Sequence, residues 1–162
     1  MIAYSDNYAT DLLHEIVDMN EYKKTYEHIG IAYPDVTSKD YFITPKEYSS
    51  FFKVLYNSGY LSLSHSELAV ELLSKCDFDK GFTAGFPKGT HIAHKFGEWG
   101  DGKKTHELHE SGFIYLNGTA YLLVIMTKGN DLQKLTEVIS YLSKVVYDNV
   151  EDPNIKDSDF TS

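Results

Sequence analysis

Four short stretches of the sequence carry side chains that are able to do chemistry. Ser5-Asp6-Asn7 precedes an amphipathic segment, and His94 to Gly100 (HKFGEWG) combines a histidine, a lysine and a glycine. Thr105 to Glu110 (THELHE) holds two histidines, and Ser50 to Lys53 (SFFK) has the spacing of a nucleophilic serine followed by a lysine. Each stretch also has an ordinary structural explanation.

Ser5, Asp6 and Asn7 are residue types that cap helices, because a side-chain oxygen can accept a hydrogen bond from a backbone N–H of the first turn. Taken alone, they predict only the start of a helix. A helix start also fixes the direction of these side chains. They are therefore candidates for one wall of an active site as well.

Lys95 lies near the end of a predicted strand, two residues before Gly97. A lysine in this position can present its ammonium group to a cleft, while the glycine lets a ligand approach the backbone. An exposed lysine that protects an edge strand from pairing is an equally good explanation.

His106 and His109 suggest a metal site, but their spacing does not match one. The zinc-binding pattern on a helix needs two histidines four residues apart, whereas these are three apart. On a strand they would point to opposite faces. We therefore predict no metal and no cofactor, with zinc at these two histidines as the alternative.

Ser50 and Lys53 lie inside a predicted helix, whose buried stripe includes Phe51 and Phe52. A nucleophilic Ser-x-x-Lys pair belongs at a helix start, where the serine meets a cleft. We interpret this pair as a chance match.

Apolar residues with helical spacing dominate the first half of the chain. They predict helices over residues 8–18, 20–29, 45–57 and 64–76. Thr44 to Glu47 and Ser64 to Glu67 have the pattern of capping boxes, and residues 30–43 form a loop. The last of these helices is expected to bury Leu68, Leu72, Leu73 and Cys76.

The second half is predicted to consist of strands and one helix. Strands are expected over residues 90–96, 113–116 and 121–127, with Asn117-Gly118 as a hairpin turn, followed by a helix over 131–149. The fold class is α+β, with a helical half (residues 4–80), then three antiparallel strands and a closing helix (81–150). Residues 151–162 form an acidic, flexible tail.

The strand at 121–127 (YLLVIMT) is apolar on both faces, which is typical of a central, covered strand. Only residues 113–116 are available to pair with it. Its other edge would lie open, so we expect this edge to be prone to pairing or self-association.

Composition excludes several classes of protein. The 162 residues suffice for one domain, and 14% aromatic residues exclude a disordered chain. The formal charge of −9 argues against nucleic acid or an anionic membrane as a partner. The single cysteine, Cys76, allows no internal disulfide and is predicted to be a small buried hydrophobe.

The order of the motifs resembles serine β-lactamases and penicillin-binding proteins. Ser-Asp-Asn is followed about ninety residues later by Lys-x-Gly on a strand, then by a hairpin and a long helix. The segments YSDNYATDLLHEI, TPKEYSSFFKVLYNSGYLSLSHSELAVELL and FPKGTHIAHKFG are similar to the corresponding family segments. The resemblance covers residues 4–149.

This resemblance implies a serine hydrolase that acts on β-lactams or on D-Ala-D-Ala bonds of peptidoglycan stem peptides through an acyl-enzyme. Ser5 would relay a proton, and Lys95 would support Ser5 and attract the substrate carboxylate. Asn7 would bind the substrate amide. Gly97 and the backbone N–H of Glu98 would line the substrate site, with that N–H as half of an oxyanion hole.

The sequence departs from the family pattern at several positions. Phe96 replaces the usual threonine or serine, and the chain contains no arginine to bind a carboxylate. Ser111 stands about where the family often has that arginine, and His109 or Lys128 would be substitutes. The loop over residues 30–43 contains Asp35 and Asp40 but no glutamate for deacylation.

In the complete family fold, a helix, two strands and the helix with the nucleophile precede Ser-Asp-Asn. Here only Met1 to Tyr4 do, so the resemblance implies the C-terminal part of such a domain, inactive as it stands. It also implies a periplasmic or extracellular location. The alternative is a non-catalytic binding or scaffold module with a degenerate fold.

Overall fold

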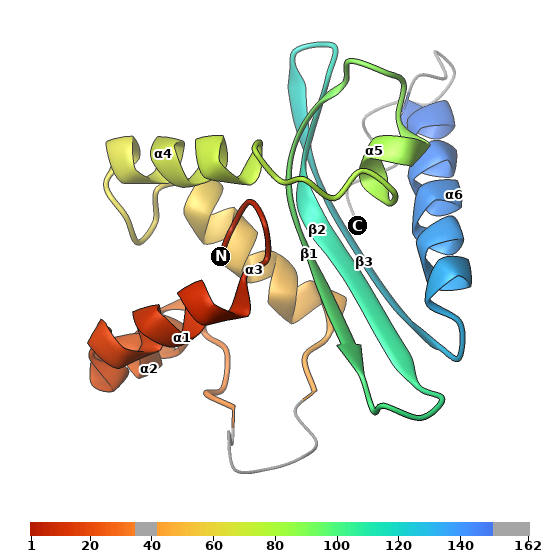
Figure 1. Ribbon diagram of the computed structural model, residues 1–162. Helices are drawn as coiled ribbons and strands as arrows, with labels where there is room; N and C mark the ends of the chain where they lie inside the picture. The colour runs from red at the N-terminus through yellow and green to blue at the C-terminus, as the bar shows by residue number, and fades with distance from the viewer. Residues whose placement is uncertain (35–41, 151–162) are drawn as a thin grey trace.

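The computed structural model describes residues 1–34 and 42–150, which form two groups of helices on either side of a small sheet (Figure 1). Asp35 and Asp40 of the predicted loop lie outside the described residues, and so does the predicted tail at 151–162.

The helices agree with the predicted ones to within a few residues at most ends. They are α1 (Asn7–Ile16), α2 (Met19–Ile29), α3 (Pro45–Tyr56), α4 (Leu63–Leu73), the short α5 (Phe82–Gly85) and α6 (Leu132–Val150). Only α5 was not predicted, because a four-residue turn has no periodicity to read. The capping box of α3 is present: Thr44 Oγ1 accepts from the N–H of Glu47, and the Glu47 carboxylate accepts from the N–H of Thr44.

Two details predicted for α4 are wrong. Its N-cap is Ser62, whose side chain accepts from the N–H of His65, so Ser64 lies inside the helix. The helix ends at Leu73, which leaves Cys76 in the loop that follows it. Leu73 is buried as expected, but Leu68 is exposed, because no other element packs over that side of α4 in the described structure.

The three strands form one antiparallel sheet in the order β1-β2-β3: β1 (His91–Gly100), β2 (His106–Leu116) and β3 (Thr119–Gly129). All three are longer than predicted, because strand pairing extends into the polar and glycine-containing segments at their ends. In the described part of the chain, β3 pairs only with β2. The predicted open edge of β3 is therefore confirmed, and β3 is an edge strand here.

The sheet separates two hydrophobic clusters, because successive side chains along a strand point to opposite faces. On one face, Ile114 and Ile92 pack with α5 and α6. On the other, Ala93 and Phe113 pack with Phe52 of α3 and with α4. This alternation decides on which side of the sheet each polar residue of β1 lies.

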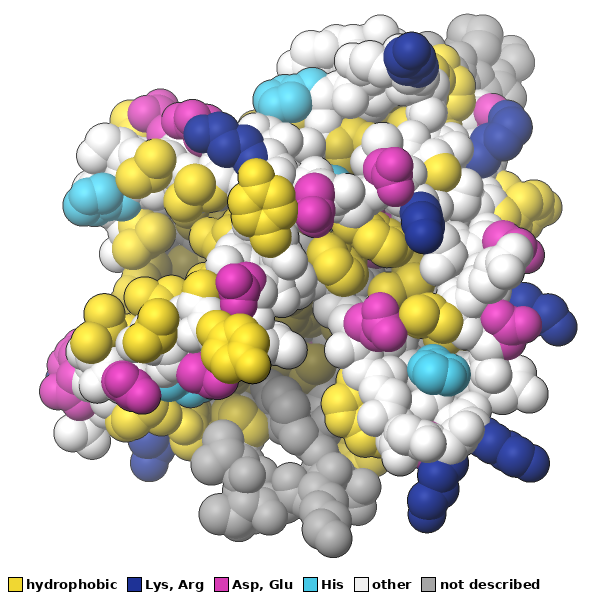
Figure 2. All heavy atoms as spheres, in the orientation of Figure 1, with side chains coloured by type: hydrophobic (Ala, Val, Ile, Leu, Met, Phe, Trp, Pro, Cys, Tyr) yellow, Lys and Arg dark blue, Asp and Glu magenta, His cyan; other side chains and the backbone are white. Residues whose placement is uncertain are grey.

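The apolar stripe of α1 is uncovered. No residue of α1 is buried, and Tyr8, Leu12 and Ile16 are among the most exposed large hydrophobic residues. Figure 2 shows hydrophobic side chains at the surface over this helix. The sequence correctly predicts an amphipathic helix here, but nothing in the described structure covers its apolar face.

The corrected N-cap of α4 can be tested by two matched substitutions. Ser62→Ala removes the capping oxygen and should lower the free energy of unfolding by about 1 kcal/mol. Ser64→Ala, two residues later inside the helix, should change it by only a few tenths of a kcal/mol, since alanine favours helices. Urea unfolding of both variants checks this, and a larger loss for Ser64→Ala would contradict the assignment.

Candidate active site

The N-terminal segment brings Ser5 next to Lys95, its partner ninety residues away. The backbone N–H of Asp77 donates to the carbonyl of Ala3 at 3.0 Å, which ties this segment to the loop after α4. Lys95 Nζ then donates to Ser5 Oγ at 2.7 Å. Two motifs that the sequence could not connect by geometry therefore meet in space.

In the Ser-Asp-Asn motif, Asp6 caps the helix and the neighbouring Ser5 contacts Lys95. Asp6 is the N-cap of α1, and its carboxylate accepts from the N–H of Ala9 at 3.2 Å. Ser5 has a left-handed backbone (φ 49°), unusual for a residue other than glycine, and its hydroxyl accepts from Lys95. Asn7, the first residue of the helix, is exposed beside them.

Lys95 is held by three interactions in a partly buried place. Besides Ser5, its ammonium donates to the backbone carbonyl of Phe96, and it lies 4.3 Å from the centre of the Phe96 ring. It also borders an apolar pocket that includes Phe52 and Leu73. Burial lowers the pKa of Lys95 below its ordinary value, although the charges of Cys76 and Asp77 act in the opposite direction.

Beyond Lys95, the same face of the sheet is open. Gly97 follows Lys95 on this face and pairs with His109 of β2. A Cβ added at Gly97 would meet no atom within 4 Å, so a ligand could approach the backbone there. His109 Nδ1 accepts from the N–H of Thr127 at 3.2 Å, and the exposed Glu98 comes next on β1. We call the hydrogen-bonded residues Ser5 and Lys95, with Asn7 and Gly97 near them in sequence and His109 paired with Gly97, the Ser5–Lys95 site.

Two of the predicted substrate-binding residues, Ser111 and Phe96, have side chains that lie against other parts of the protein. Ser111 pairs with Lys95 across the sheet and is fully buried, and in the described structure its hydroxyl has no hydrogen-bond partner. Its burial is at odds with direct binding of a substrate carboxylate. The ring of Phe96 stacks on Phe78, with 4.5 Å between the ring centres.

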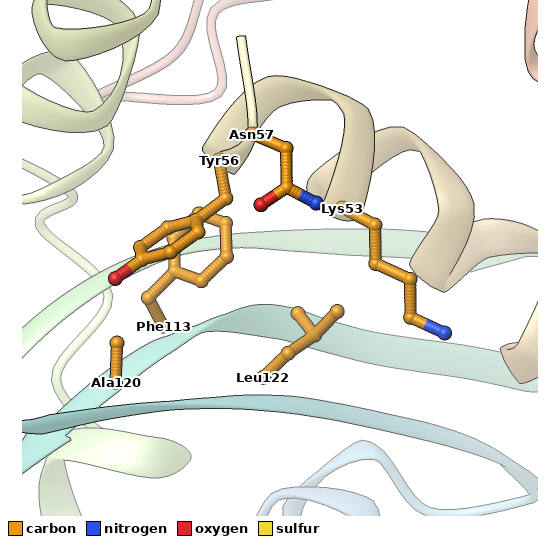
Figure 3. Close-up of a pocket in the computed structure, with 6 residues that line it drawn as sticks. All are labelled: Lys53, Tyr56, Asn57, Phe113, Ala120 and Leu122. Carbon is orange, nitrogen blue, oxygen red and sulfur yellow. The ribbon is translucent and has the colours of Figure 1, made fainter. Parts of the chain in front are cut away.

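Ser50 and Lys53 lie inside a helix, α3, as predicted. The Ser50 hydroxyl donates to the carbonyl of Lys46 within α3, at 3.5 Å. Lys53 lines a shallow pocket with Tyr56, Asn57 and three residues of β2 and β3 (Figure 3). This pocket shares no residue with the Ser5–Lys95 site, and the interpretation of SFFK as a chance match stays a prediction.

The histidines of THELHE do not meet. His106 and His109 are three residues apart on β2 and therefore lie on opposite faces. Among residues 1–34 and 42–150, no group of three or more His, Cys, Asp or Glu side chains is placed to hold a metal ion.

A buried polar cluster behind β1 was missed by sequence reasoning. His94 Nδ1 lies 2.6 Å from Glu110 Oε1, and both side chains are almost completely buried. Burial alone would lower the pKa of His94, but its hydrogen bonds with Cys76 and Glu110 raise it to about 9. No sequence signal indicated this cluster, because Glu110 precedes the strand predicted over residues 113–116 and joins a strand only in the structure.

Comparison with known proteins identifies the family. The sequence model of the β-lactamase enzyme family matches residues 1–150. The chain belongs to this family. A search of curated proteins found no match to this chain.

Solved structures of β-lactamases and of PBP-A share the fold of this chain. A class A β-lactamase from Bacteroides cellulosilyticus is 15% identical, with a TM-score of 0.76, over 89% of this chain and 58% of its own. A variant of the TLA-1 extended-spectrum β-lactamase is 19% identical (TM-score 0.74; 89% and 59%). A PBP-A variant, solved as its acyl-enzyme with penicillin G, is 17% identical (TM-score 0.62; 82% and 51%).

This member of the β-lactamase family thus spans about half the length of the structures that it matches. The chain shares with these structures the fold that was predicted, which consists of helices and an antiparallel sheet. No helix in the part of the chain that the structure describes is both long and apolar enough to cross a membrane.

The His94–Glu110 pair should make stability depend on pH. The pKa of His94 rises from 6.5 to about 9 on folding, so its contribution is complete below pH 6.5 and is lost as the pH rises through about 9. Glu110→Gln should therefore lower the free energy of unfolding by about 3–5 kcal/mol at pH 6 and by clearly less at pH 9.5.

Urea unfolding at both pH values checks this prediction. The wild-type chain at the same two pH values is the control, because Cys76 also raises the pKa of His94 and must stay in place. An equal loss of stability at the two pH values would contradict the assignment of the charged pair.

Proposed function

We propose that the Ser5–Lys95 site is the substrate-binding part of a serine hydrolase that opens β-lactams or cleaves D-Ala-D-Ala-type peptide bonds through an acyl-enzyme. The 2.7 Å hydrogen bond between Lys95 Nζ and Ser5 Oγ carries this proposal, because it joins the two motifs that define the site. Family membership and the penicillin G adduct of the related PBP-A variant support it. We also propose that the protein acts outside the cytoplasm, in the periplasm or the extracellular space.

In the proposed reaction, a serine hydroxyl attacks the carbonyl carbon, a C–O bond forms and the C–N bond breaks. The proton that this hydroxyl loses is relayed through the Ser5 hydroxyl to the leaving nitrogen, and water later hydrolyses the ester. Lys95 stabilises the charge on the Ser5 oxygen at that moment and attracts the carboxylate of the substrate. The backbone N–H of Glu98 donates to the carbonyl oxygen, whose negative charge grows as the bond forms.

The nucleophile in this proposal comes from outside these 162 residues. Ser50 is not the nucleophile in this proposal, because its hydroxyl donates to the carbonyl of Lys46 within α3 and Lys53 lines a separate pocket. The apolar pocket beside Lys95, lined in part by Ile2, Phe52 and Leu73, offers a surface on which a segment with the nucleophile can pack.

A non-catalytic binding module is the second candidate. It is favoured by Phe96, which packs on Phe78 and provides no hydroxyl for a substrate carboxylate. The burial of Ser111 and the absence of arginine from the sequence also weaken carboxylate binding.

Labelling of the full-length protein with a fluorescent penicillin (bocillin) separates the two candidates. The hydrolase forms a covalent adduct, and Lys95→Ala should slow its formation by roughly 10²–10⁴-fold, as for loss of a group that assists proton transfer. Lys53→Ala is the matched control and should label at the normal rate. Complete absence of an adduct in the folded wild-type protein would favour the binding module.

The 162-residue chain should not turn over the chromogenic cephalosporin nitrocefin, since it lacks the proposed nucleophile. The measurement is the rate of nitrocefin hydrolysis by the purified chain. Turnover that disappears in Ser50→Ala would show that Ser50 is the nucleophile and would overturn this part of the proposal.

We also propose that the open edge of β3 pairs with another strand. Its backbone groups on that side have no strand partner among the described residues, and its side chains are largely apolar. Analytical ultracentrifugation of the 162-residue chain should then show a mass that rises with concentration. A constant monomer mass would argue against pairing between copies.

A further inference from the structure

The face of the sheet that carries Lys95 continues beyond the Ser5–Lys95 site. Residues that pair directly on neighbouring strands point to the same face, so this face consists of successive rows across the strands. Lys95 stands in one row and Gly97 in the next. The row after Gly97 consists of Trp99, Glu107 and Lys128. A strand rises about 3.3 Å per residue, so this last row lies about 13 Å along the strand from Lys95.

Trp99 presents an indole that the described structure leaves largely uncovered. It is 55% exposed and is the only tryptophan of the chain. Between Trp99 and Lys95 lies Gly97, where an added Cβ would meet no atom within 4 Å. The surface from Lys95 to Trp99 is therefore open. The negative face of an exposed indole attracts cations.

Glu107 lies directly opposite Trp99 and keeps one carboxylate oxygen available. Its Oε1 accepts from Lys128 Nζ at 2.7 Å, whereas its Oε2 lies 3.6 Å from His109 Nε2, too far for a normal hydrogen bond. His109 Nδ1 accepts from the N–H of Thr127, so the neutral ring carries its proton on Nε2, the nitrogen that faces Glu107. This arrangement orients the carboxylate without filling the acceptor positions of Oε2.

The ion pair between Lys128 and Glu107 is open to water. The lysine side chain is 60% exposed and the glutamate side chain 27% exposed. Exposed ion pairs are weak, because water screens the charges and the lysine loses side-chain freedom. A second ammonium group can therefore compete with Lys128 for this carboxylate.

We propose that Trp99 and Glu107 form a subsite for an ammonium group on the side chain of the substrate, with Lys128 as the competing cation. The inference rests on the proposed function, since it takes the substrate to lie over Lys95 and Gly97. The face then offers a cation for the substrate carboxylate at one end and a carboxylate for an ammonium group at the other. The favoured substrates are zwitterionic.

The test compares the binding of ampicillin and penicillin G, which differ by one ammonium group on the side chain. Binding to the 162-residue chain is followed by the fluorescence of Trp99, because the chain has no other tryptophan. Ampicillin should bind about three- to tenfold more tightly, as for a cation at a partly exposed aromatic and acidic site. Equal dissociation constants for the two penicillins would overturn the inference and leave the proposed function intact.

Two substitutions should change the preference for ampicillin in opposite directions. Glu107→Gln should remove it, because the amide has no charge. Lys128→Met should increase it, because the competing ammonium group is gone. An ion pair with a structural role only would not give this pattern. A preference that Glu107→Gln leaves unchanged, in a variant that circular dichroism shows to be folded, would overturn the inference.

Asp148→Asn is the matched control for the loss of an exposed ion pair. Asp148 pairs with Lys144 at 2.6 Å on α6, which packs on the other face of the sheet. This variant should keep the preference of the wild-type chain. The role of the indole is tested by Trp99→Leu, followed by titration calorimetry, and the preference should fall towards one. An unchanged preference would show that the indole takes no part.

Benzylamine and the uncharged benzyl alcohol test the subsite without a β-lactam. Benzylamine should change the fluorescence of Trp99 at lower concentration than benzyl alcohol, and Glu107→Gln should remove the difference. If benzylamine behaves in this way but neither penicillin binds, the subsite stands and the result counts against the proposed function. Equal effects of the two benzyl compounds would overturn the subsite.

Discussion

The buried pair of His94 and Glu110 is the interaction on which the arrangement around β1 depends. It links β1 to β2, and through the N–H of Phe82 it also fixes α5. A charged pair without water is stable only when each partner is satisfied, because removal of either would leave an uncompensated charge. Two glycines reflect this constraint: Gly81 makes room for the carboxylate, and Gly112 lies against the backbone and Cβ of His94.

The alternation of side chains along β1 then produces two distinct chemical environments from adjacent residues. His94 is directed to the face that carries α5 and α6, where Glu110 is buried. Lys95 is directed to the other face, where it meets Ser5 and the pocket beside α3 and α4. A shift of one residue in the register would exchange the two and destroy both. In the observed register Lys95 pairs with Ser111.

The N-terminal segment completes the Ser5–Lys95 site without a buried helix to support it. The position of this segment depends on the hydrogen bond from the N–H of Asp77 to the carbonyl of Ala3 and on the contact of Ser5 with Lys95. The helix that follows, α1, leaves its apolar face exposed. An uncovered helix face and an open strand edge are both typical of surfaces that other protein segments cover. The related structures, of which this chain covers 58–59%, have the same fold over the shared part.

The sequence by itself determined the elements and the pair of motifs. Periodicity placed the helices and strands, and the order of Ser5-Asp6-Asn7 and Lys95-Phe96-Gly97 indicated the family, because both signals are local in the chain. It did not place the ends of the strands or the N-cap at Ser62, since pairing and packing decide where an element stops.

Only the tertiary structure decided which side chains meet. It assigned the cap to Asp6 and the contact with Lys95 to Ser5, and it buried Ser111. It also placed Cys76, which was expected on the buried face of a helix, half-buried in the loop after α4. The physical reason is that these relations depend on distances between segments far apart in the chain, and residue spacing along the sequence does not contain those distances.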